Sequence, residues 1–176
     1  MTEGIMQPSL SWVATEFVEG AGIRVTVRSG TAVRVEVKKR PSAEQRKSGI
    51  SESWYRDASR DVLSADKWLK EAVNNTSWHS VPDGEWFAVA IGPKILDNPY
   101  QLAAPRVVVP SLMPWVESLS SLAPVVPIQE RCPVDFNSLE VWLDGRKSFL
   151  NSSVPIRGIV WWCFDVPVAK VLSDGF

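Results

Sequence analysis

Three β-type segments separated by glycine-containing turns dominate the N-terminal part of the chain, and they restrict its fold more than any other feature. The segments are Ser11–Phe17, Gly22–Arg28 and Ala32–Lys38, and the turns are Glu19-Gly20 and Ser29-Gly30. β-branched and other apolar residues recur in them, as in strands with a buried face. Glycine adopts positive φ at little cost, so the pattern around Ser29-Gly30 predicts a β-hairpin.

Strand-like and helix-like patterns alternate further along the chain. Strands are predicted over Glu85–Ile91, Val107–Val109, Ile156–Phe164 and Val168–Leu172, with a turn at Asp165 and Pro167. A helix begins near its N-cap Ser64 and buries Trp68, Leu69, Ala72 and Val73, and a second helix, capped by Asp135, turns Phe136, Leu139, Trp142 and Leu143 inward. The fold class predicted is α+β, with mostly antiparallel sheets and a few helices, and residues 1–176 as a single domain.

Charge and composition limit the classes of partner. The net charge of −1 and the pI near 5.9 provide no global attraction to nucleic acid or to an anionic membrane. The basic segment Arg34–Lys47 could contact phosphates, but a solvated, exposed loop is the more usual reading of such a run. No apolar run reaches about 18 residues, so no membrane span is expected and a cytoplasmic location is the default. Two cysteines and one histidine cannot complete a Cys/His zinc site without carboxylates, so no metal site is predicted.

Three short motifs occur in order along most of the chain. The first is Thr15–Arg24, which reads TEFVEGAGIR, and the second is Ile91–Tyr100, which begins IGPKI. The third joins Gly158–Trp161, GIVW, to Ala169–Val171, AKV, with DGF at the end. Together they resemble the motifs of the phage and actinobacterial type of ATP-dependent RNA ligases. The resemblance implies a nucleotidyltransferase fold, the ATP-grasp-like adenylation domain of RNA and DNA ligases.

The first motif departs from the family at the residue that performs the chemistry. The family's lysine attacks the α-phosphate of ATP, and the resemblance places Phe17 at that position. A phenyl ring has no nucleophilic atom, so adenylyl transfer by this residue is excluded. The family's next acid corresponds to Glu19, and its Thr-Asn pair corresponds to Ala21-Gly22, which lacks two hydrogen-bonding side chains.

The other motifs have lost further ATP-contacting groups. Val89 stands where the family has a ribose-binding glutamate, and a valine accepts no hydrogen bond. Arg157 replaces an acid that helps to hold a divalent metal ion, and Leu172 replaces a phosphate-contacting lysine. Because several of these replacements are apolar, we expect a narrowed, partly apolar pocket lined by Phe17 and Val89, with Leu172 as a further candidate. Glu19 is the expected partner of the Arg157 charge.

The resemblance therefore predicts a catalytically inactive, RNA-ligase-like protein that acts by binding. A protein partner is favoured, and a phage-encoded, host-interacting factor working in the host cytoplasm is conceivable by analogy. The residues that remain for vestigial nucleotide binding are Glu19, Arg24, Lys94 and Lys170. Two alternatives stay open. One is a nucleotide- or RNA-end-binding protein, and the other is an active RNA ligase with a relocated lysine, for which ATP and magnesium would be needed; otherwise no cofactor is expected.

Overall fold

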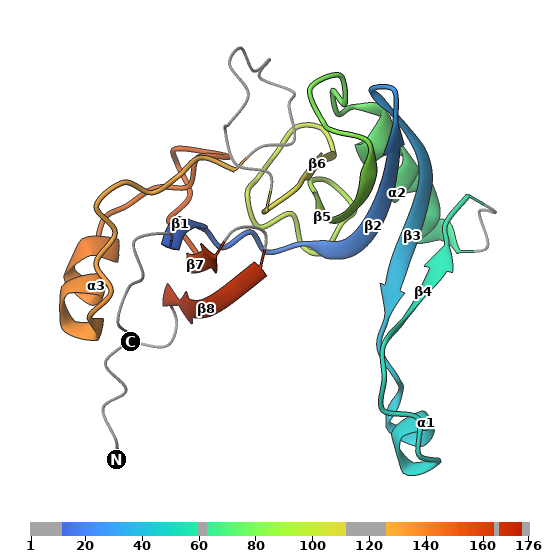
Figure 1. The fold of residues 1–176 in the computed structure, drawn as a ribbon, viewed down its shortest axis with the longest axis horizontal. Coiled ribbons are helices and arrows are strands. Elements are labelled where there is room, and N and C mark those ends of the chain that lie inside the picture. Colours follow the sequence, from blue (N-terminus) through green and yellow to red (C-terminus); the bar gives the residue numbers. More distant parts are fainter. Residues whose placement is uncertain (1–11, 60–62, 112–125, 164–165, 174–176) are drawn as a thin grey trace.

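The computed structural model describes residues 12–59, 63–111, 126–163 and 166–173 and arranges them as two antiparallel sheets with three helices (Figure 1). The five-stranded sheet has the order β4-β3-β2-β5-β6 and the three-stranded sheet the order β1-β7-β8. The elements are β1 (Trp12–Glu16), β2 (Ala21–Arg28), β3 (Thr31–Lys39), α1 (Ala43–Lys47), β4 (Trp54–Asp57), α2 (Ser64–Asn74), β5 (Gly84–Ile91), β6 (Arg106–Val108), α3 (Phe136–Leu143), β7 (Gly158–Cys163) and β8 (Val166–Leu172). The predicted combination of mostly antiparallel sheets and a few helices is confirmed.

Strand β2 lies at the centre of the larger sheet and separates two different environments. Its residues Ile23, Val25 and Val27 are fully buried in the main core, which also contains the apolar face of α2. The opposite face of β2 carries Gly22 and Arg24. The β2–β3 hairpin turns at Ser29-Gly30, where both φ angles are positive (47° and 71°), so the predicted hairpin is confirmed.

The three-stranded sheet is covered on one side by α3. Leu139 and Leu143 of this helix pack with Ala14, Ile159 and Trp161 in a separate apolar cluster. The other side of the sheet carries Val160 and Trp162, which pack against Phe17. Trp161 and Trp162 thus point to opposite faces, as the alternation predicts, and both are buried. Trp162 is covered by neighbouring side chains, among them Val13 and Phe17, and does not form an exposed contact surface.

The charged stretch after β3 is more ordered than the predicted loop. Lys38 and Lys39 still belong to β3, and Ala43–Lys47 form α1, which lies at the tip of a projecting arm (Figure 1). The helix forms because the Ser42 side chain accepts a hydrogen bond from the backbone N–H of Gln45 while the Gln45 side chain accepts one from the backbone N–H of Ser42. This capping box stabilises one turn of helix that has no buried face.

Three further local predictions are corrected by the structure, and one strand is found that was not predicted. The N-cap of α2 is Leu63 rather than Ser64, because the Asp66 carboxylate accepts the Leu63 N–H. The edge strand β4, which has a short and mostly polar sequence, was not predicted. Phe136 is 56% exposed because it stands in the first turn of α3, away from the sheet. Pro167 lies within β8 rather than at a turn, which an edge strand tolerates.

Some sequence predictions lie outside the described residues. These are the start of the first strand at Ser11, the turn at Asp165 and the terminal motif residues Asp174–Phe176.

Candidate functional site

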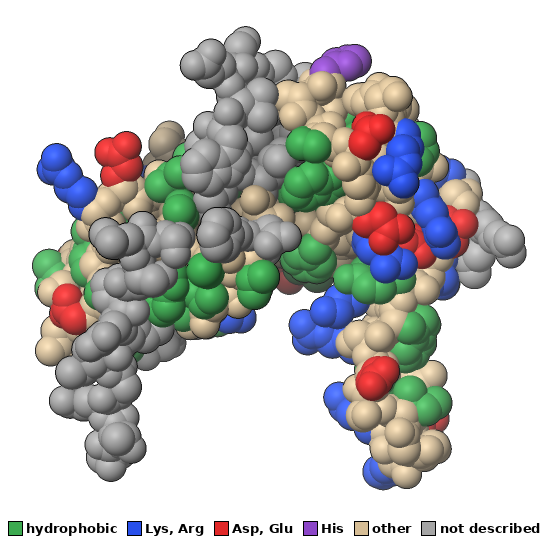
Figure 2. Space-filling model, viewed as in Figure 1, with side chains coloured by type: hydrophobic (Ala, Val, Ile, Leu, Met, Phe, Trp, Pro, Cys, Tyr) green, Lys and Arg blue, Asp and Glu red, His purple; other side chains and the backbone are tan. Residues whose placement is uncertain are grey.

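A cleft of about 780 Å³ opens between the two sheets, within the size range of small-molecule and cofactor sites. One wall comes from β2, β3 and β5, and the other from the end of β1, from β7 and from β8. In the space-filling view the molecule is hollowed between the side of the three-stranded sheet and the arm that carries α1 (Figure 2). Hydrophobic side chains gather on the former side, and Lys and Arg side chains stand at the base of the arm.

Phe17 forms part of the cleft wall where β1 ends. Its backbone N–H donates to the carbonyl of Gly158 at 2.8 Å, which holds the residue beside β7. The half-buried ring packs with Val160 and Trp162. The Nζ atom of Lys170, on β8, lies 4.8 Å from the ring centroid, a cation–π geometry. Phe17, at the position where the resemblance expects a nucleophile, therefore places an aromatic ring in the cleft wall, with the Lys170 ammonium group above it.

The Glu19-Gly20 segment crosses closely over the larger sheet. The backbone N–H of Glu19 donates to the hydroxyl of Tyr100 at 2.7 Å, and burial raises the pKa of Tyr100 to about 12, so the phenol stays neutral. A Cβ atom on Gly20 would lie 2.5 Å from both the carbonyl oxygen of Ala90 and a methyl of Val89. Glycine is therefore required at this crossing, and the side chain of residue 19 is held at the cleft margin.

Arg157 and Glu19 form the expected ion pair, with 3.8 Å between Nε and Oε2. Their side chains are 45% and 48% exposed, so the pair stands at the surface and not in a buried pocket. An exposed pair contributes little to stability, and the arginine needs no buried counter-charge. Glu19 is one of the acidic residues that line the cleft, so the ion pair balances its charge.

Val89 lines the cleft from β5, directly opposite Gly22 of β2. It is also buried, in an apolar cluster with Val18, Ile91 and Tyr100. The expected apolar lining is thus confirmed for Phe17 and Val89. The cleft nevertheless keeps room for a ligand.

Three residues that were predicted to face a nucleotide lie outside the cleft lining. They are the phosphate contacts Lys94 and Arg24 and the apolar replacement Leu172. Lys94 is exposed in the turn that closes between Gly92 and Ile95, with a φ of 64°. Leu172 pairs with Gly158 at the far end of β8, beyond the part of the strand that faces the cleft, so its expected place in the lining is wrong. Arg24, the second of the predicted phosphate contacts, is also absent from the cleft lining.

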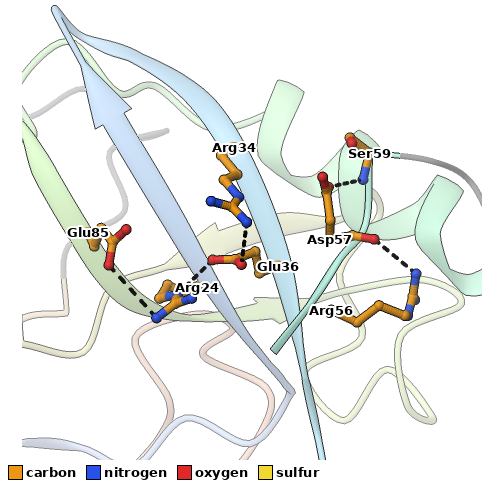
Figure 3. A network of polar contacts seen from close by, with 7 residues as sticks. All are labelled: Arg24, Arg34, Glu36, Arg56, Asp57, Ser59 and Glu85. Atoms are coloured by element: carbon orange, nitrogen blue, oxygen red, sulfur yellow. Dashed lines mark hydrogen bonds and ion pairs between the residues drawn. The ribbon is translucent and has the colours of Figure 1, made fainter. Parts of the chain in front are cut away.

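Arg24 is held by a network on the open face of the larger sheet (Figure 3). Its Nε donates to Glu36 at 2.7 Å, and Nη1 lies 3.8 Å from Glu85. Its guanidinium stacks on the ring of Tyr55 at 4.4 Å, and Arg34 shares the Glu36 carboxylate at 3.0 Å. The hydrogen bond that Arg24 donates to the Glu36 carboxylate raises the pKa of Arg24. These contacts occupy the guanidinium, so it supports the strands rather than a ligand in the cleft.

Other residues enter the cleft that the sequence did not assign to a site. Arg40 follows β3 on the same side as Lys38, and both are exposed. Phe87 is 46% exposed and Val168 is 42% exposed, which is unusual for apolar residues in strands. Phe87 could have been found from the alternation of β5, because it stands two residues before Val89 and so shares its face.

A buried carboxyl group lies close to the cleft, at Glu16 on β1. Its side chain is almost fully buried, Oε2 accepts the backbone N–H of Phe149 at 3.0 Å, and Ser148 also hydrogen-bonds to the group. Oε1 has no hydrogen-bond partner among the described residues. Burial raises the pKa of Glu16 from 4.5 to about 7, against the two hydrogen bonds, which lower it.

Within the described ranges, no group of three or more His, Cys, Asp or Glu side chains is arranged to hold a metal ion. None of the helices in this part of the chain is long and apolar enough to cross a bilayer. Comparison of the chain with protein-family models, with curated proteins and with solved structures finds no match.

Proposed function

We propose that this chain is a non-catalytic relative of the ATP-dependent RNA ligases, a nucleotidyltransferase-like domain that acts by binding a protein partner. The observation that carries the proposal is the cleft wall at Phe17. A phenyl ring stands where the resemblance requires an amine, and the nearby Lys170 ammonium is stacked on that ring. The wall around it consists of apolar side chains, which suit a binding surface better than a triphosphate site.

The glycines of the three motifs support a retained scaffold. A Cβ atom would lie 2.5 Å from another atom at Gly20, 2.6 Å at Gly92 and 2.3 Å at Gly158. Backbone atoms are among the neighbours at all three positions, so no side chain can be accommodated without a shift. The motif residues that the fold needs are therefore present, whereas Phe17 and Val89, which line the cleft, differ from the family.

An intact-mass measurement after incubation with ATP and magnesium or manganese tests the proposal. We expect no adduct of one adenylyl group, because the chain offers no amine at residue 17 and the Arg157 position carries the wrong charge for a metal ligand. A stable adenylyl adduct on any lysine would overturn the proposal.

An active ligase with a relocated lysine nucleophile is the second candidate function, and the cleft lining reduces the number of lysines that could serve. Lys38 and Lys170 line the cleft, whereas Lys39 and Lys94 do not. If an adduct formed, peptide mapping should therefore find it on Lys38 or Lys170. The matched variants Lys38→Met and Lys94→Met separate a cleft nucleophile from nonspecific labelling.

Binding of a nucleotide or an RNA end without reaction is the remaining alternative. Lys38, Arg40 and Lys170 could hold phosphates in the cleft. A thermal-shift titration with ATP and with a short RNA tests it, since a ligand that binds only the folded state raises the melting temperature. A saturable shift, lost in Lys38→Met, would favour this alternative over a protein partner.

A further inference from the structure

Three cations and a strip of exposed apolar side chains meet in the cleft. Lys38 and Arg40 stand on one wall and Lys170 on the other, all with exposed side chains. Within the described part of the chain, none of the three has a carboxylate at ion-pair distance. Of the acids that line the cleft, Glu19 is paired with Arg157 and Glu16 is buried. The cleft surface is therefore locally positive although the chain as a whole has a net charge of −1.

The apolar strip is unusually accessible for side chains on strands. Phe87 projects from β5 with 46% of its surface exposed, and Val168 from β8 with 42% exposed. Phe17, which is half-buried, adds to this apolar surface on the cleft wall. Exposed apolar surface rimmed by charge is characteristic of an interaction site.

Strand β8 adds a further recognition element, its backbone. It is the last strand of the order β1-β7-β8, so among the described strands β7 is its only neighbour. Its other edge presents backbone N–H and C=O groups to pair with a further strand. Pro167 has no N–H, so such pairing would run along Val168–Leu172.

We propose that these features form one docking groove, made of Phe17, Lys38, Arg40, Phe87, Val168 and Lys170, for an extended acidic segment of a partner protein. The segment adds as a strand beside β8. The face that it turns to the cleft carries both apolar side chains, which lie against Phe87 and Val168, and carboxylates, which lie against the three cations. An RNA strand matches the charge but not the strand edge, so the backbone groups of β8 favour a peptide. This inference rests on the proposed function, in which the domain binds a protein.

Fluorescence anisotropy with synthetic probes and the full chain tests the proposal. The probe is a labelled peptide of about ten residues in which Ser occupies every second position and Asp and Val take turns at the others, called the Asp-Val peptide. It is compared with a Lys-Val peptide of the same pattern, with the Asp-Val peptide N-methylated at every residue, and with a uridine oligonucleotide. We expect saturable binding of the Asp-Val peptide that weakens with salt. The Lys-Val and N-methylated peptides should bind at least about tenfold more weakly, since one has the opposite charge and the other lacks the N–H donors that pair with β8.

Two matched charge reversals locate the site. Lys38→Glu with Arg40→Glu should weaken binding of the Asp-Val peptide by about tenfold or more. Arg46→Glu with Lys47→Glu makes the same change of charge on the exposed α1, outside the groove, and should leave the affinity within about twofold. Val168→Ser tests the apolar contact without changing the charge of the groove and should also weaken binding.

Three results would overturn the inference. They are no binding of the Asp-Val peptide, equal effects of the two charge reversals, and full binding of the N-methylated peptide. Binding of the uridine oligonucleotide that depends on Lys38 and Arg40, in place of peptide binding, would assign the groove to RNA instead. The ATP mass measurement is independent of all of these. An adenylyl adduct together with peptide binding would refute only the non-catalytic proposal, whereas absence of both would refute the docking groove alone.

Discussion

Replacing Glu16 by glutamine should remove a pH dependence of stability that this residue imposes on the fold. The carboxyl group is buried, and one of its oxygens lacks a hydrogen-bond partner among the described residues. Its pKa is about 7 in the folded protein, against an ordinary value of 4.5. The folded state therefore binds this proton more tightly than the unfolded chain does. Unfolding releases the proton between these two values, so stability is full below about pH 4.5 and falls as the pH rises through about 7.

The magnitude follows from the two pKa values. The difference between 4.5 and about 7, at about 1.36 kcal/mol for each pH unit, corresponds to a loss of about 3 kcal/mol across the window. Glutamine keeps an acceptor for the Phe149 N–H but places an amide nitrogen where Oε1 is unpartnered, at a cost of about 1 kcal/mol. The variant should therefore be more stable than the wild type by about 2 kcal/mol at about pH 8, a rise in Tm of roughly 4–8 °C, and should show no advantage at about pH 5.

Urea unfolding of the two proteins at a series of pH values between about 5 and about 8 measures this effect. Glu140→Gln, which removes an exposed carboxyl group on α3, is the matched control and should keep the wild-type slope. A wild-type free energy of unfolding that is level or increases over this range would refute the reasoning. So would a Glu16→Gln variant whose slope matches that of the wild type.

Three further outcomes are expected. Phe17→Lys alone should yield no adenylyl adduct by intact mass, because catalytic groups that act as a unit are not restored singly; robust adenylylation would show that the site is otherwise intact. Gly158→Ala should destabilise the fold by roughly 2–5 kcal/mol in urea unfolding, because φ is 149° and the new Cβ would meet a backbone oxygen at 2.3 Å. The control Gly145→Ala, at a position with open space around it, should cost only about 1 kcal/mol of stability. Asp66→Asn should cost about 3 kcal/mol near neutral pH, because it breaks the bidentate pair with Arg56; a loss below about 1 kcal/mol would contradict this role.

The sequence by itself determined those strands, turns and helix caps that depend only on neighbouring residues. Alternation in Gly22–Arg28 and Glu85–Ile91 identified central strands because each strand buries one face against the same core. The Ser29-Gly30 turn and the Asp135 cap were predictable because backbone conformation and capping depend on neighbouring residues. The resemblance to the ligase motifs also predicted that Phe17 and Val89 share one site, and both line the cleft.

Only the tertiary structure decided which charged residues share the cleft. Arg24, Lys38 and Lys170 are equally plausible phosphate contacts in the sequence. Strand register directs Arg24 to Glu36 and Glu85, whereas Lys38 and Lys170 line opposite walls of the cleft. Register depends on pairing between distant segments, which periodicity does not encode. The same holds for Glu16, whose pKa is raised because a loop far along the chain buries it. Desolvation is a property of the assembled fold, so no local pattern could have revealed it.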